Sequence, residues 1–263
     1  MIILKTERDL ERMRPACRVA REVLEEVSAF VQPGQTTRAI DEFAAECIRK
    51  HQAQSAFLGY QVGHRKYPSH LCISVNEQVV HGLGTERRVE FGDIVSLDVG
   101  VTYRGYIGDN AATVPVGGCN PAAQRLLDVT EQALYEGISQ AVAGNRVADI
   151  SRAVQEFVER NGFSVVREFV GHGVGRTMHE DPQVPNFVEH GKTSPKLRPG
   201  MTIAIEPMVN LGRAEVRVLK DGWTVVTEDG LLSAHFEHTV LITEGQAEIL
   251  TCRDTNPSVQ KAG

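Results

Sequence analysis

The chain has 263 residues, of which 41% are hydrophobic and 24% charged, and its formal net charge is −6. This composition is typical of a soluble globular protein with a substantial core, and the negative charge argues against a broad nucleic-acid footprint. The first five residues already include a charge, which predicts no signal peptide. No apolar run approaches the roughly 20 residues of a membrane span.

The cysteines are odd in number and scattered, without a CxxC pair: Cys17, Cys47, Cys72, Cys119 and Cys252. This pattern predicts a cytoplasmic protein with free thiols, no disulfide framework and no structural zinc.

Four elements are predicted in the first part of the chain: a helix over 6–31, a helix over 37–51, a loop over 52–69 and a short strand over 71–75. An apolar stripe through Met13, Val19 and Val27 supports the first helix. Residues 32–34, Gln-Pro-Gly, end it.

Residues 91–114 predict two strands joined by a turn at 103–105, with one aspartate on each strand. Asp98 lies inside an apolar run, IVSLDV, where aspartate is normally depleted. The hairpin would place Asp98 and Asp109 opposite or diagonal to each other, with Cβ atoms roughly 4.5–8 Å apart. Two such carboxylates repel each other unless a proton or a cation lies between them. Two isolated aspartates on a solvated sheet face would need neither.

The second part of the chain predicts helices from 121 to about 142 and over 147–160, a strand over 163–170, a glycine-rich turn and long loop over 171–187, and two further carboxylate-bearing strands. The loop carries His172 and His179. A single histidine in a turn is most often hydrogen-bonded there. The flanking Gly171 and Gly173 favour a ligand instead, since glycine lets the backbone and a metal approach closely.

The two parts repeat each other. A glycine precedes the first carboxylate of each part by six residues, as Gly92 precedes Asp98 and Gly200 precedes Glu206. Glu237 then follows in a strand-like run, much as Asp109 does in the first part. The helices also match, with Gly34 over Gly144 and Ile40 over Ile150. These matches predict pseudo-repeats over about 6–119 and 121–250 that share one site, and therefore a single catalytic domain over 1–263.

The candidate metal ligands are four carboxylates and one imidazole: Asp98, Asp109, His172, Glu206 and Glu237. Their charge of about −4 matches two divalent ions, which in two-metal hydrolases lie roughly 3.5–4 Å apart. Oxygen ligands with a single imidazole leave Mn, Fe, Co, Zn and Ni open. His81 and His179 are candidate donors to an oxyanion and to a leaving nitrogen, or else ordinary surface histidines.

The motifs HGLG, DVGVTYRGYIGD, GHGVG, MHED, TIAIEPMV and FEHT follow one another over about residues 3–252. Together they resemble the type I methionine aminopeptidases of the pita-bread fold. That fold is α+β, with two pseudo-symmetric halves, a central antiparallel sheet and helices on its outer face. The resemblance implies removal of the initiator methionine from nascent proteins when the next residue is small.

The resemblance also implies a role for each ligand. Asp98 would bind one metal ion, and Asp109 and Glu237 would bridge both. His172 and Glu206 would complete the second ion, and Glu206 would move the proton of the attacking water.

Further roles come from the same resemblance. His179 would polarise the scissile carbonyl and His81 would contact the scissile nitrogen. Asn76 and Ser233 would offer backbone oxygens to a monovalent cation, Na or K. The methionine pocket would be lined by Tyr60, Tyr67, Cys72, Met178 and Trp223.

Three features depart from the family pattern. Phe57 stands where a cysteine is usual before LGY, Met178 stands where an aromatic residue is usual before the second histidine, and the segment 61–69 is longer than usual. These departures affect the shape of the pocket and leave every metal ligand in place.

The expected partners are nascent polypeptide N-termini and the ribosome near its exit tunnel, with no membrane and no sequence-specific nucleic acid. The expected state is a monomer. Prolidase-like and aminopeptidase P-like enzymes are the alternatives, but they carry a large N-terminal domain, whereas the first helix here begins near Thr6. A non-catalytic scaffold on the same fold is a further alternative, which predicts lost ligands.

Overall fold

A computed structural model describes residues 1–189, 191 and 193–252. The helices are α1 (Glu7–Phe30), α2 (Thr37–Lys50), α3 (Pro121–Ser139) and α4 (Val147–Arg160). They agree with the predicted helices to within one residue at each end, except that α3 ends three residues before the predicted position. Among the described residues, no helix is long and apolar enough to cross a membrane. Cys17, Cys47, Cys72 and Cys119 are free thiols, as predicted.

Local sequence explains where the helices begin. The Thr6 side chain accepts a hydrogen bond from the Asp9 amide, and the Asp9 carboxylate accepts one from the Thr6 amide, which forms a capping box on α1. The Asn120 side chain accepts a hydrogen bond from the Ala123 amide and so caps α3. Pro121 occupies the first helical position, where a backbone N–H would have no partner within the helix.

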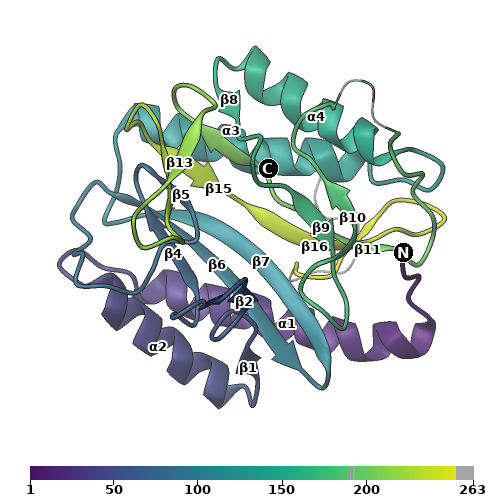
Figure 1. Cartoon of the computed structure of the whole chain (residues 1–263), viewed down its shortest axis with the longest axis horizontal. Coiled ribbons are helices and arrows are strands. Elements are labelled where there is room, and N and C mark those ends of the chain that lie inside the picture. Colours follow the sequence, from purple (N-terminus) through teal and green to yellow (C-terminus); the bar gives the residue numbers. More distant parts are fainter. Residues whose placement is uncertain (190, 192, 253–263) are drawn as a thin grey trace.

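A nine-stranded antiparallel sheet runs through both halves of the molecule (Figure 1). Its main path is β1 (Gln54–Ser55), β6 (Ile94–Tyr103), β7 (Tyr106–Pro115), β16 (Glu237–Leu241), β11 (Thr202–Ile205), β9 (Gly171–Gly173) and β10 (Glu180–Val184). Two more strands pair off this path, β4 (Cys72–Val75) with β6 and β17 (Glu248–Ile249) with β16.

Three smaller sheets flank the central one. They are β15 (Ser233–His235) with β12 (Met208–Asn210) and β8 (Ser164–Val165), β13 (Val216–Val218) with β14 (Val225–Thr227) and β5 (Gln78–Val80), and the hairpin of β2 (Gln61–Val62) and β3 (Arg65–Lys66). The expected strand over 163–170 is therefore wrong beyond Val165, because Phe169 and Val170 line a cavity and do not pair. The predicted loop over 52–69 contains β1, β2 and β3.

Each half has its own hydrophobic core under its own pair of helices. In the first half, α1 packs on β6 and β7, and the core includes Ile40 and Leu97. In the second half, α3 and α4 pack on each other and on the strands around β11, and the core includes Ile150 and Ile203. In the view of Figure 1 the two helix pairs lie on opposite sides of the central strands.

The register of β6 and β7 confirms the predicted hairpin. Asp98 pairs with Ala111 and Gly100 pairs with Asp109, so the two aspartates are diagonal neighbours on one face. Arg104 (φ 51°) and Gly105 (φ 82°) form the two-residue turn, whose positive φ values suit the twist of the strands.

The register also corrects the expected equivalence between Asp109 and Glu237. Ile205 pairs with His238, which places Glu206 opposite Glu237, just as Asp98 lies opposite Ala111. Glu237 and Ala111 also pair with each other where β16 meets β7. Glu237 is therefore the counterpart of Ala111, and the counterpart of Asp109 lies two residues away from Glu237.

Candidate metal centre

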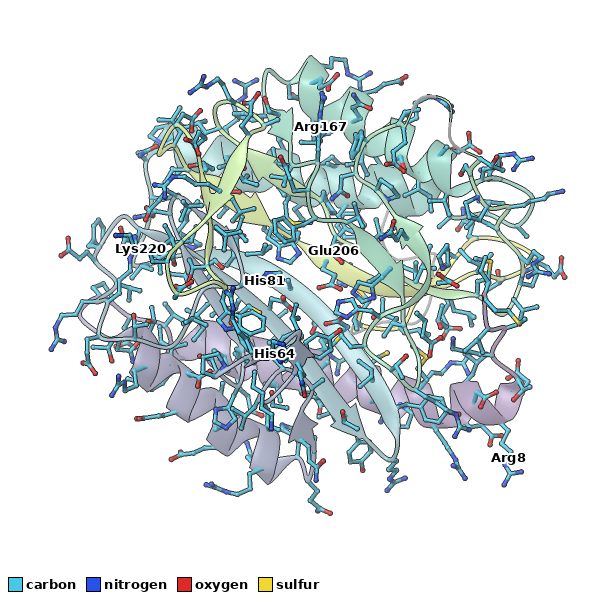
Figure 2. All side chains as sticks on the ribbon, viewed as in Figure 1. Arg8, His64, His81, Arg167, Glu206 and Lys220 are labelled. Atoms are coloured by element: carbon cyan, nitrogen blue, oxygen red, sulfur yellow. The ribbon has the colours of Figure 1, made fainter. Side chains whose placement is uncertain are left out.

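The five predicted ligands come from five consecutive strands of the central sheet. In sheet order these are Asp98 on β6, Asp109 on β7, Glu237 on β16, Glu206 directly after β11 and His172 on β9. Both halves contribute, and the site lies at the junction between them. Glu206 lies near the middle of the molecule in Figure 2, as does His81.

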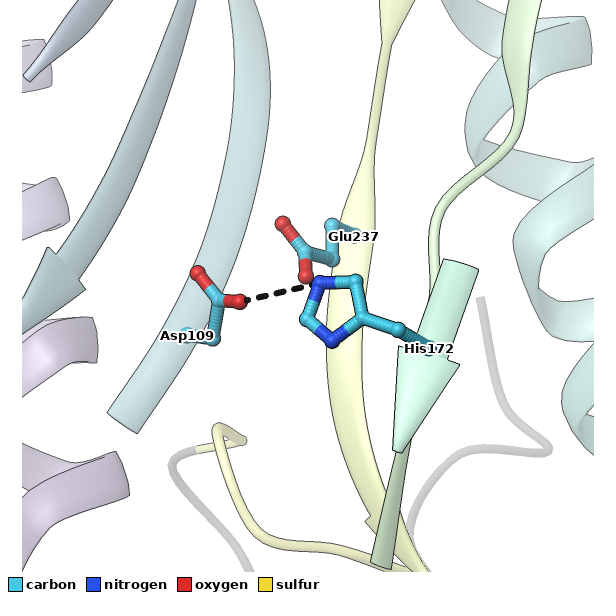
Figure 3. Close-up of side chains that lie close together, drawn as sticks. All are labelled: Asp109, His172 and Glu237. Atoms are coloured by element: carbon cyan, nitrogen blue, oxygen red, sulfur yellow. Dashed lines mark ion pairs between the residues drawn. The ribbon is translucent and has the colours of Figure 1, made fainter. Parts of the chain in front are cut away.

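The ligand atoms converge in a small volume (Figure 3). One ligand atom each of Asp109, His172 and Glu237 lies within 4.8 Å of the other two, and all three residues are buried. His172 Nε2 is 3.6 Å from Asp109 Oδ2 and 3.5 Å from Glu206 Oε1. This is the spacing at which several side chains can share a cation.

His172 is oriented for binding by its own strand. Its Nδ1 lies 2.9 Å from the carbonyl oxygen of Gly173 and donates to it, which leaves the Nε2 lone pair facing the carboxylates. Such a backbone contact is typical of a metal-binding histidine, because it selects the tautomer and the ring orientation.

Gly171 and Gly173 are needed for strand packing, which differs from the predicted role of letting a metal approach the backbone. A Cβ at Gly171 would lie 2.4 Å from the carbonyl oxygen of Ala204, and one at Gly173 would lie 2.2 Å from that of Asp181. The glycines therefore let β9 fit between its neighbouring strands. His172 lies on a strand, and the expected glycine-rich turn at this position is wrong.

The carboxylates lack the partners that buried charges require. Asp98 Oδ1, Asp109 Oδ1 and Glu237 Oε1 are buried without a hydrogen bond. Burial raises the pKa of Asp98 to about 7. Burial and the neighbouring carboxylates raise the pKa values of Asp109, Glu206 and Glu237 well above their usual range. These unpartnered acceptors fit divalent cations, which would compensate their charge.

The ligands line a cavity of about 260 Å³. All twelve predicted site residues line it: Tyr60, Tyr67, Cys72, His81, Asp98, Asp109, His172, Met178, His179, Glu206, Trp223 and Glu237. The structure thus brings the predicted ligands, the two further histidines and the predicted pocket wall into one site.

Phe57 and Met178, which both depart from the family pattern, pack side by side over Gly100 of β6. A Cβ at Gly100 would lie 2.4 Å from Met178 Cε and 2.8 Å from Phe57 Cε1, so the glycine makes room for both side chains. Tyr67 contacts Phe57 and Trp223 edge to face, with ring centroids 6.4 and 5.2 Å apart. This gives the cavity an apolar wall on the side of Phe57 and Met178.

The pKa values of the other two predicted histidines are lowered, which favours their neutral forms. Burial, followed by the nearby His179, lowers the pKa of His81 to about 4. Partial burial also lowers the pKa of His179. Tyr60 lies against His179, with its hydroxyl oxygen 2.6 Å from Nδ1. Neutral imidazoles can donate a hydrogen bond without adding positive charge beside bound cations.

Sequence reasoning missed one polar residue, His235. It is buried, its Nε2 has no hydrogen-bond partner, and that atom lies 3.8 Å from Glu206 Oε2. The signal was available in principle, because side chains two residues apart on a strand share a face and His235 precedes Glu237 by two. It is also the position that the register makes equivalent to Asp109.

Several apolar lining residues were also missed: Val62, Val80, Phe169, Val170 and Met208. They come from short strands and irregular segments with no periodic signal. Asn76 and Ser233 lie outside the cavity lining, but the structure brings them together, since the Ser233 amide donates to the Asn76 carbonyl at 2.9 Å.

Known proteins resemble this chain in sequence and in fold. The profile of metallopeptidase family M24 matches residues 11–244. The chain belongs to metallopeptidase family M24. A methionine aminopeptidase from Clostridium perfringens is 49% identical over 251 residues, which are 95% of this chain and 99% of that relative. Metal use is thus a property of the family.

Solved structures agree. The methionine aminopeptidase from Rickettsia prowazekii superposes with a TM-score of 0.91 at 37% identity, covering 96% of this chain and all of that one. The prolidase from Pyrococcus furiosus shares the fold, with a TM-score of 0.76 at 23% identity, but this chain covers only 66% of it. The expected family and pita-bread fold are confirmed, and the resemblance is to the methionine aminopeptidases of M24 over nearly the whole chain.

Proposed function

We propose that the protein is a metal-dependent aminopeptidase that removes the N-terminal methionine of polypeptides whose second residue is small. One observation carries this proposal: four carboxylates, of which Asp109 and Glu237 are buried and Asp98 and Glu206 half-buried, and an oriented histidine line a cavity with an apolar wall. The unpartnered oxygens support a cation site, and the wall supports an apolar first residue.

The proposed ligands for two divalent ions are Asp98, Asp109, His172, Glu206 and Glu237, of which Asp109 and Glu237 would contact both ions. Mn, Fe, Co, Zn and Ni all suit such a donor set. When bound, the ions supply Lewis acidity and lower the pKa of water. A separate monovalent cation, Na or K, would bind the backbone oxygens of Asn76 and Ser233.

The side chains around the ligands would handle protons. Glu206 would accept the proton of the attacking water on its carboxylate, and would later release it to the leaving amine. His179 would donate a hydrogen bond from its ring N–H to the carbonyl oxygen as negative charge develops there. His81 would contact the scissile nitrogen.

The apolar wall would bind the methionine side chain through Tyr60, Tyr67, Cys72, Met178 and Trp223. We further propose that the whole chain acts as one catalytic domain, as a monomer in the cytoplasm, on nascent polypeptide N-termini. The ribosome near its exit tunnel would then be a partner.

The test is N-terminal residue release from peptides by metal-stripped protein, with each divalent metal added back in turn. We expect release of methionine from Met-Ala-Ser, little from Met-Leu-Ser and none from Ala-Met-Ser. The Asp109→Asn variant is the matched control, because it keeps the shape of the side chain and removes the charge. Metal binding without any release would support a non-catalytic scaffold, and preferential cleavage of Xaa-Pro peptides would support a prolidase.

A further inference from the structure

Tyr60 lies where the apolar wall of the cavity meets His179. Its backbone is held at both ends, since its amide donates to the Phe57 carbonyl and its carbonyl accepts from the Tyr67 amide, each at 2.8 Å. The β2–β3 hairpin begins immediately afterwards. The tyrosine is therefore an anchored residue at the neck of an exposed hairpin, and its side chain enters the cavity.

The Tyr60 hydroxyl is directed at His179. Its oxygen lies 2.6 Å from His179 Nδ1, and the two rings meet edge to face with centroids 5.3 Å apart. Within the described part of the chain, neither the hydroxyl nor Nδ1 has another hydrogen-bond partner. A lining residue that only contacted an apolar side chain would need no such bond.

The direction of this bond and the tautomer of His179 depend on each other. A neutral imidazole has one N–H and one lone pair. If the phenol donates to Nδ1, the hydrogen is on Nε2; the reverse arrangement would leave the phenol hydrogen without an acceptor among the described residues. His172 provides the contrast, because its Nδ1 faces a carbonyl oxygen, which can only accept. The two ring centroids lie 4.4 Å apart, yet Nδ1 of His172 faces an obligatory acceptor while Nδ1 of His179 faces a hydroxyl that is able to donate.

We infer that Tyr60 is a positioning residue that holds His179 with its hydrogen on Nε2, ready to donate to the substrate carbonyl. The inference rests on the proposed function for the identity of that carbonyl. Removing such a donor outright typically costs about two to three decades of kcat. Without the tyrosine hydroxyl the donor is still present but samples both tautomers and more orientations, so we expect a loss of about tenfold, the value of one net hydrogen bond.

The first measurement is the ¹⁵N NMR spectrum of the His179 ring in metal-free protein, assigned with a His179→Gln variant. In the wild type we expect Nδ1 without hydrogen and Nε2 with it, and in Tyr60→Phe a mixture of the two. Tyr67→Phe is the matched control for the spectrum. Its hydroxyl donates to the carbonyls of Leu71 and Gly82, so its removal should leave the His179 signals unchanged.

The second measurement is steady-state kinetics with Met-Ala-Ser. Tyr60→Phe should lower kcat about tenfold while KM and metal affinity stay the same, because only a hydroxyl has been removed. The inference is overturned if wild-type His179 carries its hydrogen on Nδ1, or if Tyr60→Phe changes kcat without changing the tautomer, or the tautomer without changing kcat. Failure of the wild type to release methionine would contradict the proposed function instead, while the spectrum would still decide whether Tyr60 selects the tautomer.

Discussion

The two halves of the molecule use the same strand arrangement differently. In the first half, β6 and β7 are ten residues each, paired throughout and joined by a two-residue turn. Their counterparts in the second half, β11 and β16, have four and five residues. The chain between β11 and β16 forms β12 to β15. It carries Met208 and Trp223 into the cavity wall and places the buried His235 beside Glu206.

The difference shows how a symmetric fold makes an asymmetric site. The regular hairpin positions Asp98 and Asp109 by register alone. The interrupted pair in the second half supplies Glu206 and Glu237 and, in addition, part of the pocket wall. In the second half, Glu237 lies two residues away from the position that is equivalent to Asp109. That position is occupied by His235, a neutral group next to Glu206.

The largest loss of activity is expected when one carboxylate is removed from either half. We expect Asp109→Ala in the first half and Glu237→Ala in the second to abolish methionine release and tight metal uptake alike, because each residue would contact two cations. The remaining buried carboxylates would also lose their compensation. Calorimetric titration with Mn²⁺ measures this, and normal stoichiometry and affinity in either variant would contradict a shared site.

A smaller effect is expected in the second half outside the ligands. His179→Ala should bind metals normally and lose about two to three decades of kcat, the usual cost of one donor to a developing oxyanion. Metal titration of the same variant is the control. Loss of the metals, or an unchanged kcat, would remove His179 from its proposed role.

The stability of the metal-free protein should depend on pH through Asp98 of the first half. Burial raises the pKa of Asp98 to about 7 in the folded state, whereas an unfolded aspartate has a pKa of about 3.9. A group whose folded pKa is raised stabilises the fold below its unfolded pKa, and this stability is lost as the pH rises towards the folded value.

Metal-stripped wild type should therefore lose more thermal stability between pH 5 and pH 8 than metal-stripped Asp98→Asn, which has no proton to release at this position. A saturating divalent metal should restore the wild type at pH 8. Parallel melting curves for the two proteins would show that the buried carboxyl does not titrate in this range.

The smallest expected effect concerns selectivity. Met178 is flexible and packs against Gly100 beside Phe57, so the wall can adapt its shape. Apolar pockets discriminate by only about 1–3 kcal/mol per methylene. We expect Met178→Phe to increase the ratio of kcat/KM for Met-Ala over that for norleucine-Ala and Leu-Ala, with methionine preferred in both proteins. Unchanged ratios would show that residue 178 does not determine the preference.

The sequence predicted the regular parts of the molecule well. The helices and the hairpin of Asp98 and Asp109 follow from local periodicity and turn residues, which act over a few positions. The offset between Asp109 and Glu237 could not be predicted, because it depends on the register between strands far apart in the chain. The β9 strand was missed for the same reason: three residues with two glycines have no strand signal of their own, and only neighbouring strands make them extended.

The most direct test of the shared centre is anomalous diffraction from crystals soaked in Mn²⁺. Two peaks are expected between β7 and β16, one contacted by Asp98 and the other by His172 and Glu206, with Asp109 and Glu237 touching both. Absence of Mn²⁺ from this position, or a site whose ligands all come from one half of the chain, would contradict the account.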